Sequence, residues 1–151
     1  MKIFKIYAIA VSLLMLMVAC GKDDDNVNSN ALNGINKDWK LISVNGEEPE
    51  FTVYMRFEGA EFWIYQQLYA LNYVMYDGTY SIKGNVISGS YFDGSDWKCS
   101  YTGSISGNGT RLELVSKEKK PIKNVYEACT IPESVIEEAS TRSVEWNGYH
   151  L

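Results

Sequence analysis

Hydrophobic and polar residues alternate along most of the chain between residues 37 and 116. In residues 51–58 the odd positions are all apolar and the even positions are mostly polar, which is the period-two pattern of a strand with one buried face. Similar runs occur at residues 39–44, 61–66, 71–76, 79–82, 86–92, 97–105 and 110–116. The pattern predicts about eight short strands.

Short turn sequences separate these runs: Asn45-Gly46, Asp77-Gly78, Gly84-Asn85, Asp93-Gly94 and Asn108-Gly109. Such connections permit hairpins and leave no room for crossover helices, so the sheet should be antiparallel. A sheet of about eight strands must close on itself or pack on a second sheet, because long open edges invite aggregation. We therefore expect an all-β, up-and-down barrel, with a two-sheet β-sandwich as the alternative.

One short helix is expected near the C-terminus. Thr130 offers an N-cap, Pro132 a first-turn proline and Glu133 a capping-box glutamate, ahead of the largely apolar residues 135–139. The tail 141–151 contains further apolar residues and could add an edge strand or lie across a barrel end.

The first residues follow a different pattern. Lys2 and Lys5 flank the start of an apolar run over residues 6–19, which ends in small residues before Cys20. This is the organisation of a secretory signal peptide over residues 1–19, and the run is shorter than the about 20 residues of a membrane span. Residues 17–20 resemble a bacterial lipobox. The resemblance implies cleavage before Cys20, acylation of that residue and anchoring to a membrane.

The residues after Cys20 suggest a location. Lys22, Asp23, Asp24 and Asp25 resemble the export signal of surface lipoproteins from Bacteroidetes-type bacteria. We expect attachment to the outer membrane with exposure at the cell surface, and a periplasm-facing lipoprotein is the alternative. Residues 20–36 are rich in Asn, Asp, Ser and Gly and are predicted to form a disordered tether, which leaves residues 37–151 as the barrel domain.

Charge and cysteine content restrict the partners. The chain has 14 basic and 19 acidic residues, and loss of Lys2 and Lys5 with the signal peptide leaves 12 against 19, a net charge of −7. This balance argues against nucleic acid, whose binding depends on basic side chains. Cys99 and Cys129 form an even pair in a compartment that permits disulfides, so a disulfide is a candidate, and two buried free thiols are the alternative.

The sequence contains little that indicates catalysis. Its single histidine is His150, and it has no Cys–His cluster for zinc, no P-loop and no dinucleotide-binding glycine motif. We predict a non-enzymatic protein that uses no cofactor and no metal.

Aromatic residues are abundant, with 11 Tyr, 4 Trp and 5 Phe, and are densest over residues 62–76. If Phe62 and Ile64 point into the core, neighbouring rings must lie on the other face of the strand. We expect a small amphipathic or glycan-like ligand to bind in an aromatic-lined cup built from this segment: Trp63, Tyr65, Gln66, Gln67, Tyr69, Asn72 and Tyr73. The alternatives are a packed core with an exposed aromatic face that docks or inhibits a surface protein, and rings that pack beneath the C-terminal helix and tail.

Several segments resemble one known family. Residues 39–46, 78–89, 91–97, 112–114 and 131–132 resemble the lipocalin-like domains of Bacteroidetes lipoproteins, and the resemblance covers roughly residues 37–140. It implies a small, lipid-anchored, lipocalin-like β-barrel. The matching residues are mostly turn and core positions, so they indicate the fold more than the ligand.

Overall fold

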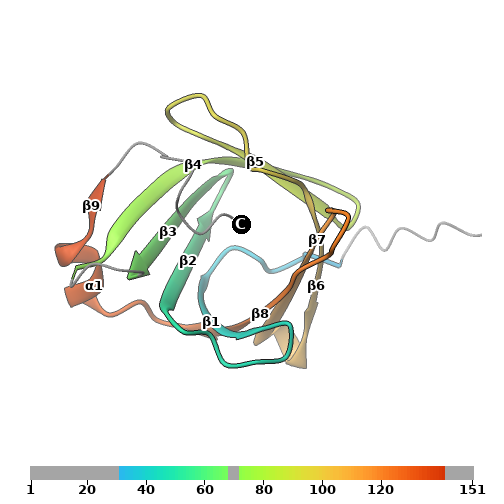
Figure 1. The fold of residues 1–151 in the computed structure, drawn as a ribbon, viewed down its shortest axis with the longest axis horizontal. Coiled ribbons are helices and arrows are strands. Elements are labelled where there is room, and N and C mark those ends of the chain that lie inside the picture. Colours follow the sequence, from blue (N-terminus) through green and yellow to red (C-terminus); the bar gives the residue numbers. More distant parts are fainter. Residues whose placement is uncertain (1–30, 68–71, 142–151) are drawn as a thin grey trace, which may run out of the picture.

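The computed structural model describes residues 31–67 and 72–141, and its main element is a closed barrel of eight antiparallel strands (Figure 1). Each strand pairs with the next along the chain, and β8 pairs with β1 to close the ring. The strands are β1 (Asp38–Val44), β2 (Thr52–Glu58), β3 (Glu61–Gln67), β4 (Val74–Lys83), β5 (Val86–Tyr91), β6 (Tyr101–Ser106), β7 (Arg111–Ser116) and β8 (Lys123–Cys129). The predicted up-and-down barrel is confirmed, and the sandwich alternative is wrong.

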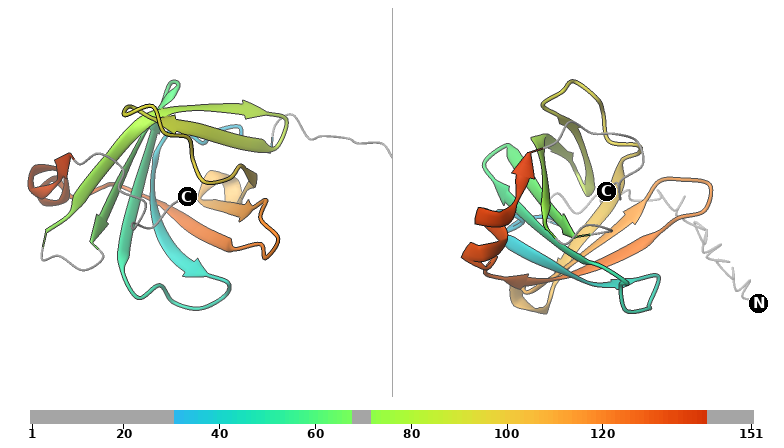
Figure 2. Two further views of the ribbon diagram at one scale, coloured as in Figure 1. Left: turned by 45° about the horizontal axis from the view of Figure 1, so that its top comes forward. Right: turned by 60° about the vertical axis from the view of Figure 1, so that its left-hand side comes forward.

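Three smaller elements complete the described part of the chain. A 3-10 turn, η1 (Gly107–Gly109), joins β6 to β7. The short helix α1 (Glu133–Glu138) and the two-residue strand β9 (Ser140–Thr141), which pairs in parallel with β4, lie outside the barrel wall (Figure 2). No helix among these residues is long and apolar enough to cross a membrane.

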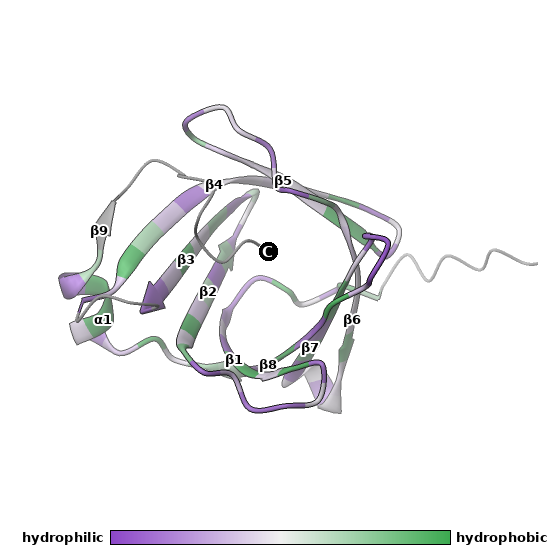
Figure 3. Cartoon of the chain, viewed as in Figure 1, coloured by the Kyte–Doolittle hydropathy of each residue, from purple (hydrophilic) through white to green (hydrophobic). Residues whose placement is uncertain are grey.

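The alternating sequence pattern determines which side chains enter the barrel. In β2, the side chains of Val53, Met55 and Phe57 are buried, and the residues between them are partly exposed. Alternating hydrophobic and hydrophilic bands along the strands show the same period (Figure 3). The alternation therefore places the apolar side chains of β2 inside the barrel, away from water.

The predicted turn residues adopt turn conformations at two well-defined hairpins. Asn45 and Gly46 have φ angles of 53° and 89°, and Val44 and Glu47 exchange two backbone hydrogen bonds across them. These positive φ angles are those of a type I′ turn, which Asn-Gly adopts at low cost. Asn108 and Gly109 have φ angles of 56° and 85° between β6 and β7.

The strand count was predicted correctly through two compensating errors. Asp77-Gly78 is not a turn, because Gly78 lies within β4, opposite Phe62 on one side and Tyr91 on the other. A Cβ at Gly78 would overlap the Ser90 carbonyl oxygen and lie 2.7 Å from the Tyr91 Cα, so glycine is required there by close backbone approach. The two runs expected around this position are thus one strand, whereas β8 was not predicted.

One end of the barrel is closed by residues that precede β1. Leu32 and Ile35 are 3% and 4% exposed and join the hydrophobic core, and the Trp39 Nε1 donates a hydrogen bond of 2.8 Å to the Ile35 carbonyl. We call this the plugged end, defined by Leu32, Ile35 and Trp39. Residues 31–36 were expected in the disordered tether; the structure corrects this boundary, because their apolar side chains are buried in the barrel.

The predicted C-terminal helix is present, but its expected cap is wrong. Pro132 occupies the N-cap position of α1, and no side chain caps the helix there. Thr130 lies two residues farther upstream and does not serve as the cap. Val135 is the buried residue of the helix.

Candidate functional site

Polar side chains are buried at the end of the barrel opposite the plugged end. We call this the polar end, defined by Gln66, Ser116 and Asn124, which are the buried polar residues of the described chain. Their direction follows from the sheet register, since Gln66 pairs with inward-facing Val53 and Asn124 pairs with inward-facing Leu114. Polar groups in such a position need partners, because burial without a hydrogen bond is costly.

A continuous series of aromatic contacts lines the interior from β4 to β6. The ring of Tyr76 lies 6.4 Å from Tyr91, which lies 5.5 Å from Phe62. Phe62 is 5.0 Å from Trp97, and Trp97 is 6.1 Å from Tyr101. All four contacts are edge-to-face, the arrangement that the ring quadrupoles favour. One side of the interior therefore consists of rings.

Trp97 reaches this interior from the β5–β6 connection because β5 carries a glycine beside it. A Cβ on Gly89 would lie 2.5 Å from Cε2 and 2.7 Å from Cζ2 of the Trp97 ring. The backbone N–H of Trp97 donates a hydrogen bond of 2.9 Å to the Gly89 carbonyl and fixes the connection against the strand. The indole thus lies against the inner face of the barrel wall.

Two buried polar atoms of this interior have no hydrogen-bond partner in the structure. They are the Trp97 Nε1, a donor, and the Asn124 Oδ1, an acceptor, on side chains that are 5% and 2% exposed. An unsatisfied buried donor or acceptor costs about 1–3 kcal/mol, so native interiors usually pair such atoms with protein groups, ordered water or a ligand. Trp97 Nε1 can donate a hydrogen bond to an acceptor group, and Asn124 Oδ1 can accept one from a donor group.

The tyrosines of the interior remain neutral. Burial raises the pKa of Tyr91, and nearby Tyr76 and Asp93 act in the same direction. Burial also raises the pKa of Tyr101, assisted by its hydrogen bond with Cys99. Since the buried side chains of the described residues include no charged group, the interior favours an uncharged ligand.

The structure separates the predicted ligand-binding residues into two groups. Gln66 is buried inside the barrel, whereas Trp63, Tyr65 and Tyr73 belong to a cluster on the outer face with Ile131 and Val135. Tyr65 is 3% exposed there, so its ring packs near α1 and is not on the surface. The expectation that Trp63 and Tyr65 face away from the core of Phe62 and Ile64 is confirmed.

The remaining predicted residues do not join these groups. Gln67 is half-buried at the end of β3, and Asn72 is exposed. Tyr69 lies outside the described residues. The predicted set therefore does not converge on one cup.

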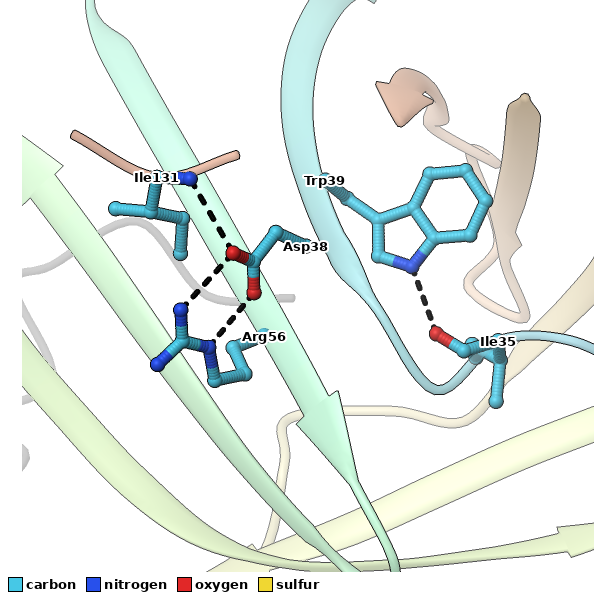
Figure 4. A network of polar contacts seen from close by, with 5 residues as sticks. All are labelled: Ile35, Asp38, Trp39, Arg56 and Ile131. Atoms are coloured by element: carbon cyan, nitrogen blue, oxygen red, sulfur yellow. Dashed lines mark hydrogen bonds and ion pairs between the residues drawn. The ribbon is translucent and has the colours of Figure 1, made fainter. Parts of the chain in front are cut away.

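A charged network holds the segment before α1 on the barrel (Figure 4). Arg56 donates hydrogen bonds of 2.7 and 2.9 Å to the two carboxylate oxygens of Asp38, and the Ile131 backbone N–H donates one of 3.2 Å to Asp38 Oδ2. Burial raises the pKa of Asp38, but the hydrogen bonds from Arg56 and Ile131 and the Arg56 charge outweigh it and lower the pKa. The network therefore holds Ile131 against the barrel, where it packs in the same cluster as Tyr65.

The candidate disulfide is not formed, because Cys99 and Cys129 are both free thiols. Cys99 precedes the start of β6, and Cys129 ends β8. Since β6 and β8 run in the same direction on either side of β7, these positions lie at opposite ends of the barrel. Cys99 packs against the core, as the sequence predicted.

The residues expected to direct export lie outside the described part of the chain. They are Cys20, Lys22, Asp23, Asp24 and Asp25. The signal peptide over residues 1–19 and the tail from residue 142 lie outside it as well. Their roles stay predictions.

Trp97 and Asn124 were not predicted as site residues. Asn124 lies in β8, which was not predicted, and three consecutive residues there, Asn124, Val125 and Tyr126, are buried, so the segment lacks a strict period-two pattern. Trp97 Nε1 is buried without a hydrogen-bond partner because of tertiary packing, which no local sequence pattern indicates.

The closed eight-stranded barrel matches the fold of a solved lipocalin-like protein. A lipocalin-like protein from Bacteroides uniformis is similar with a TM-score of 0.51 and 19% identity, over 64% of this chain and 99% of that one. An uncharacterised protein from Bacteroides eggerthii has a TM-score of 0.47 and 13% identity, over 62% and 98%. No family model and no curated protein matches the chain. At this identity the likeness establishes the fold alone.

Proposed function

We propose that the barrel binds a small, uncharged, amphipathic molecule at its polar end. The observation that carries this proposal is the pair of buried atoms without partners, Trp97 Nε1 and Asn124 Oδ1. The ring series from Tyr76 to Tyr101 would contact the apolar part of the ligand, and the two atoms would bind its acceptor and donor groups. Binding would thus satisfy groups that are costly to bury unpaired.

The role we propose is binding without catalysis. The interior offers neutral hydroxyl, amide and indole groups, and the buried set of the described chain lacks a charged side chain that could act as a base or nucleophile. Turnover of an ester or glycoside by the purified chain, lost on changing an interior residue, would contradict this role.

Dye binding to the full chain tests the interior site. N-phenyl-1-naphthylamine is neutral, aromatic and has one N–H donor, and energy transfer from tryptophan distinguishes dye in the barrel from dye in detergent. We expect saturable energy transfer that Asn124→Leu weakens roughly tenfold, because the variant removes the acceptor at similar volume. The unliganded variant should be at least as stable as the native chain, since it also removes an unsatisfied group.

Asn33→Leu provides the matched control, because Asn33 is exposed near the plugged end. It should bind the dye as the native chain does. Absent energy transfer, or equal affinity in the Asn124→Leu variant, would overturn the proposal and indicate that ordered water fills the polar end.

We also propose that the chain is a lipoprotein anchored through Cys20 at the outer membrane, with the barrel at the cell surface. Support comes from the residues around the cysteine: an apolar run, a lipobox-like tetrapeptide and the acidic residues Asp23, Asp24 and Asp25. Metabolic labelling with palmitate should mark the native chain and not Cys20→Ser, and the variant should leave the membrane fraction. Protease added to intact cells should remove the barrel; full protection would instead indicate a periplasm-facing protein.

A further inference from the structure

The pairing of β5 with β6 is short. These strands pair only at Val86 with Thr102 and at Ile87 with Tyr101. Farther along β5 its edge is covered by the connection that precedes β6, through the Ser90–Asp96 bridge among other contacts. A pocket of about 380 Å³ lies at this position. That volume is within the range of small-molecule sites.

Hydroxyl groups dominate the chemistry of this pocket. Thr79 pairs with Ser90 and Ser81 pairs with Ser88, so four outward-facing hydroxyl side chains form a compact group on the β4–β5 hairpin. The Oγ atoms of Ser81 and Ser88 are 3.4 Å apart. Ser100 adds a fifth hydroxyl to the lining. Each of these groups both donates and accepts hydrogen bonds.

One carboxylate accompanies the hydroxyls. Ser90 Oγ donates a hydrogen bond of 2.5 Å to Asp96 Oδ1, which holds the carboxylate at the pocket. No lysine or arginine lines the pocket, so it would repel phosphate, sulfate or an acidic sugar. A wholly apolar ligand would desolvate the hydroxyls without replacing their hydrogen bonds.

An exposed aromatic ring continues the same face. The Phe92 backbone N–H donates a hydrogen bond of 3.1 Å to the Asp77 carbonyl, which extends the β4–β5 ladder by one residue. Alternation along the strand then places Phe92 on the outward face with Ser88 and Ser90. Its side chain is 59% exposed, the highest value among the exposed large hydrophobic residues of the described chain. An exposed phenyl ring on the same face as the serine hydroxyls suits a ligand that has one apolar face and several hydroxyl groups.

We propose that this outer face, comprising Phe92, the hydroxyls of Thr79, Ser81, Ser88 and Ser90, and Asp96, binds a neutral saccharide. One C–H face of the sugar ring packs on Phe92, and its hydroxyls exchange hydrogen bonds with the serines and the Asp96 carboxylate. The site lies outside the barrel and is separate from the polar end. The protein would therefore bind two ligands of different chemistry, one in the barrel interior and one on the outer face of the β4–β5 hairpin.

Saturation-transfer difference NMR on the full chain tests this site, in a detergent without a sugar head group. The probes are methyl β-D-glucopyranoside, methyl α-D-mannopyranoside and N-acetylglucosamine, with glucose 6-phosphate as the anionic comparison. We expect saturation of the C–H protons of at least one neutral sugar and much weaker binding of the phosphorylated sugar. Phe92→Ala and Asp96→Ala should each weaken binding of the neutral sugar roughly tenfold.

Matched variants separate this site from general surface effects. Ile122→Ala removes another exposed large hydrophobic residue, and Ser104→Ala removes an outward-facing serine of β6 outside the pocket; both should leave sugar binding unchanged. No saturation of any neutral sugar, or saturation that persists in both Phe92→Ala and Asp96→Ala, overturns the proposal. The sugars should not displace N-phenyl-1-naphthylamine, so either site can fail while the other stands.

Discussion

At the scale of single residues, Asp38 joins three parts of the chain through one carboxylate. It binds the guanidinium of Arg56 on β2 and the backbone of Ile131 before α1, and its side chain is 14% exposed. A bidentate pair of this kind is stronger than a typical surface ion pair, because both hydrogen bonds are charge-assisted and partly shielded from water.

Asp38→Asn should lower the free energy of unfolding at neutral pH by about 1.5–3 kcal/mol, the usual range for hydrogen bonds to charged groups. The folded-state pKa of Asp38 is lowered, so its contribution is present above the unfolded value of about 3.9 and is lost as pH falls through the folded pKa. Urea unfolding at several pH values should show the two proteins converging in acid. A difference that stays constant from neutral pH to strong acid would contradict this role.

Trp39 makes a second specific contact, in the core. It is 0% exposed, and its indole N–H is paired with the Ile35 carbonyl. Trp39→Phe should destabilise the chain by about 1–3 kcal/mol, because it removes this buried hydrogen bond and part of the buried ring volume, although the Ile35 carbonyl keeps its hydrogen bond from the Lys37 N–H. Trp63→Phe is the matched control on the outer face and should cost less. Chemical denaturation of both variants measures the difference.

At the scale of elements, the segment before β1 acts as part of the barrel. Leu32 packs on Gly103 of β6. A Cβ on residue 103 would lie only 2.6 Å from Leu32 Cδ2, so the glycine leaves the space that Leu32 fills. The Ile105 N–H also donates a hydrogen bond of 2.8 Å to the Ala31 carbonyl. Leu32 and β6 are therefore complementary in shape.

Leu32→Ala should lower the free energy of unfolding by about 2–4 kcal/mol, as expected for a large-to-small change in a core. Asn33→Ala, one residue farther along and exposed, should have little effect. Thermal unfolding of both variants checks the prediction. Equal stability of Leu32→Ala and the native chain would contradict this role and indicate that residues 31–36 belong to the tether.

At the scale of the whole molecule, the barrel is held by strand pairing and packing, with no cross-link between Cys99 and Cys129. Closing the loop between these cysteines would have contributed about 3.5 kcal/mol in the chain-entropy model. Reduction should therefore leave the thermal midpoint unchanged, and thiol titration of the unfolded chain should detect both cysteines without reductant. A midpoint that falls in dithiothreitol would show that a disulfide forms.

The site was less predictable than the fold, and the difference has a physical cause. The aromatic run over residues 62–76 indicated large rings on both faces of β3, which is correct, but the sequence could not say what covers each face. Tyr65 is buried because residues more than sixty positions later, Ile131 and Val135, pack against it. Contacts of this kind depend on the path of the chain and leave no local pattern.

The sequence by itself determined the strand period, the Asn-Gly hairpins and hence an antiparallel sheet that must close, because side-chain alternation and turn conformation are local properties of the backbone. Only the tertiary structure decided that Asp77-Gly78 lies within β4, that β8 closes the ring and that Leu32 plugs one end. It alone also revealed Trp97 and Asn124 as buried side chains, each with an unpaired polar atom. These features depend on which backbones approach closely and which polar atoms are left unpaired, and both are set by packing between residues distant in sequence.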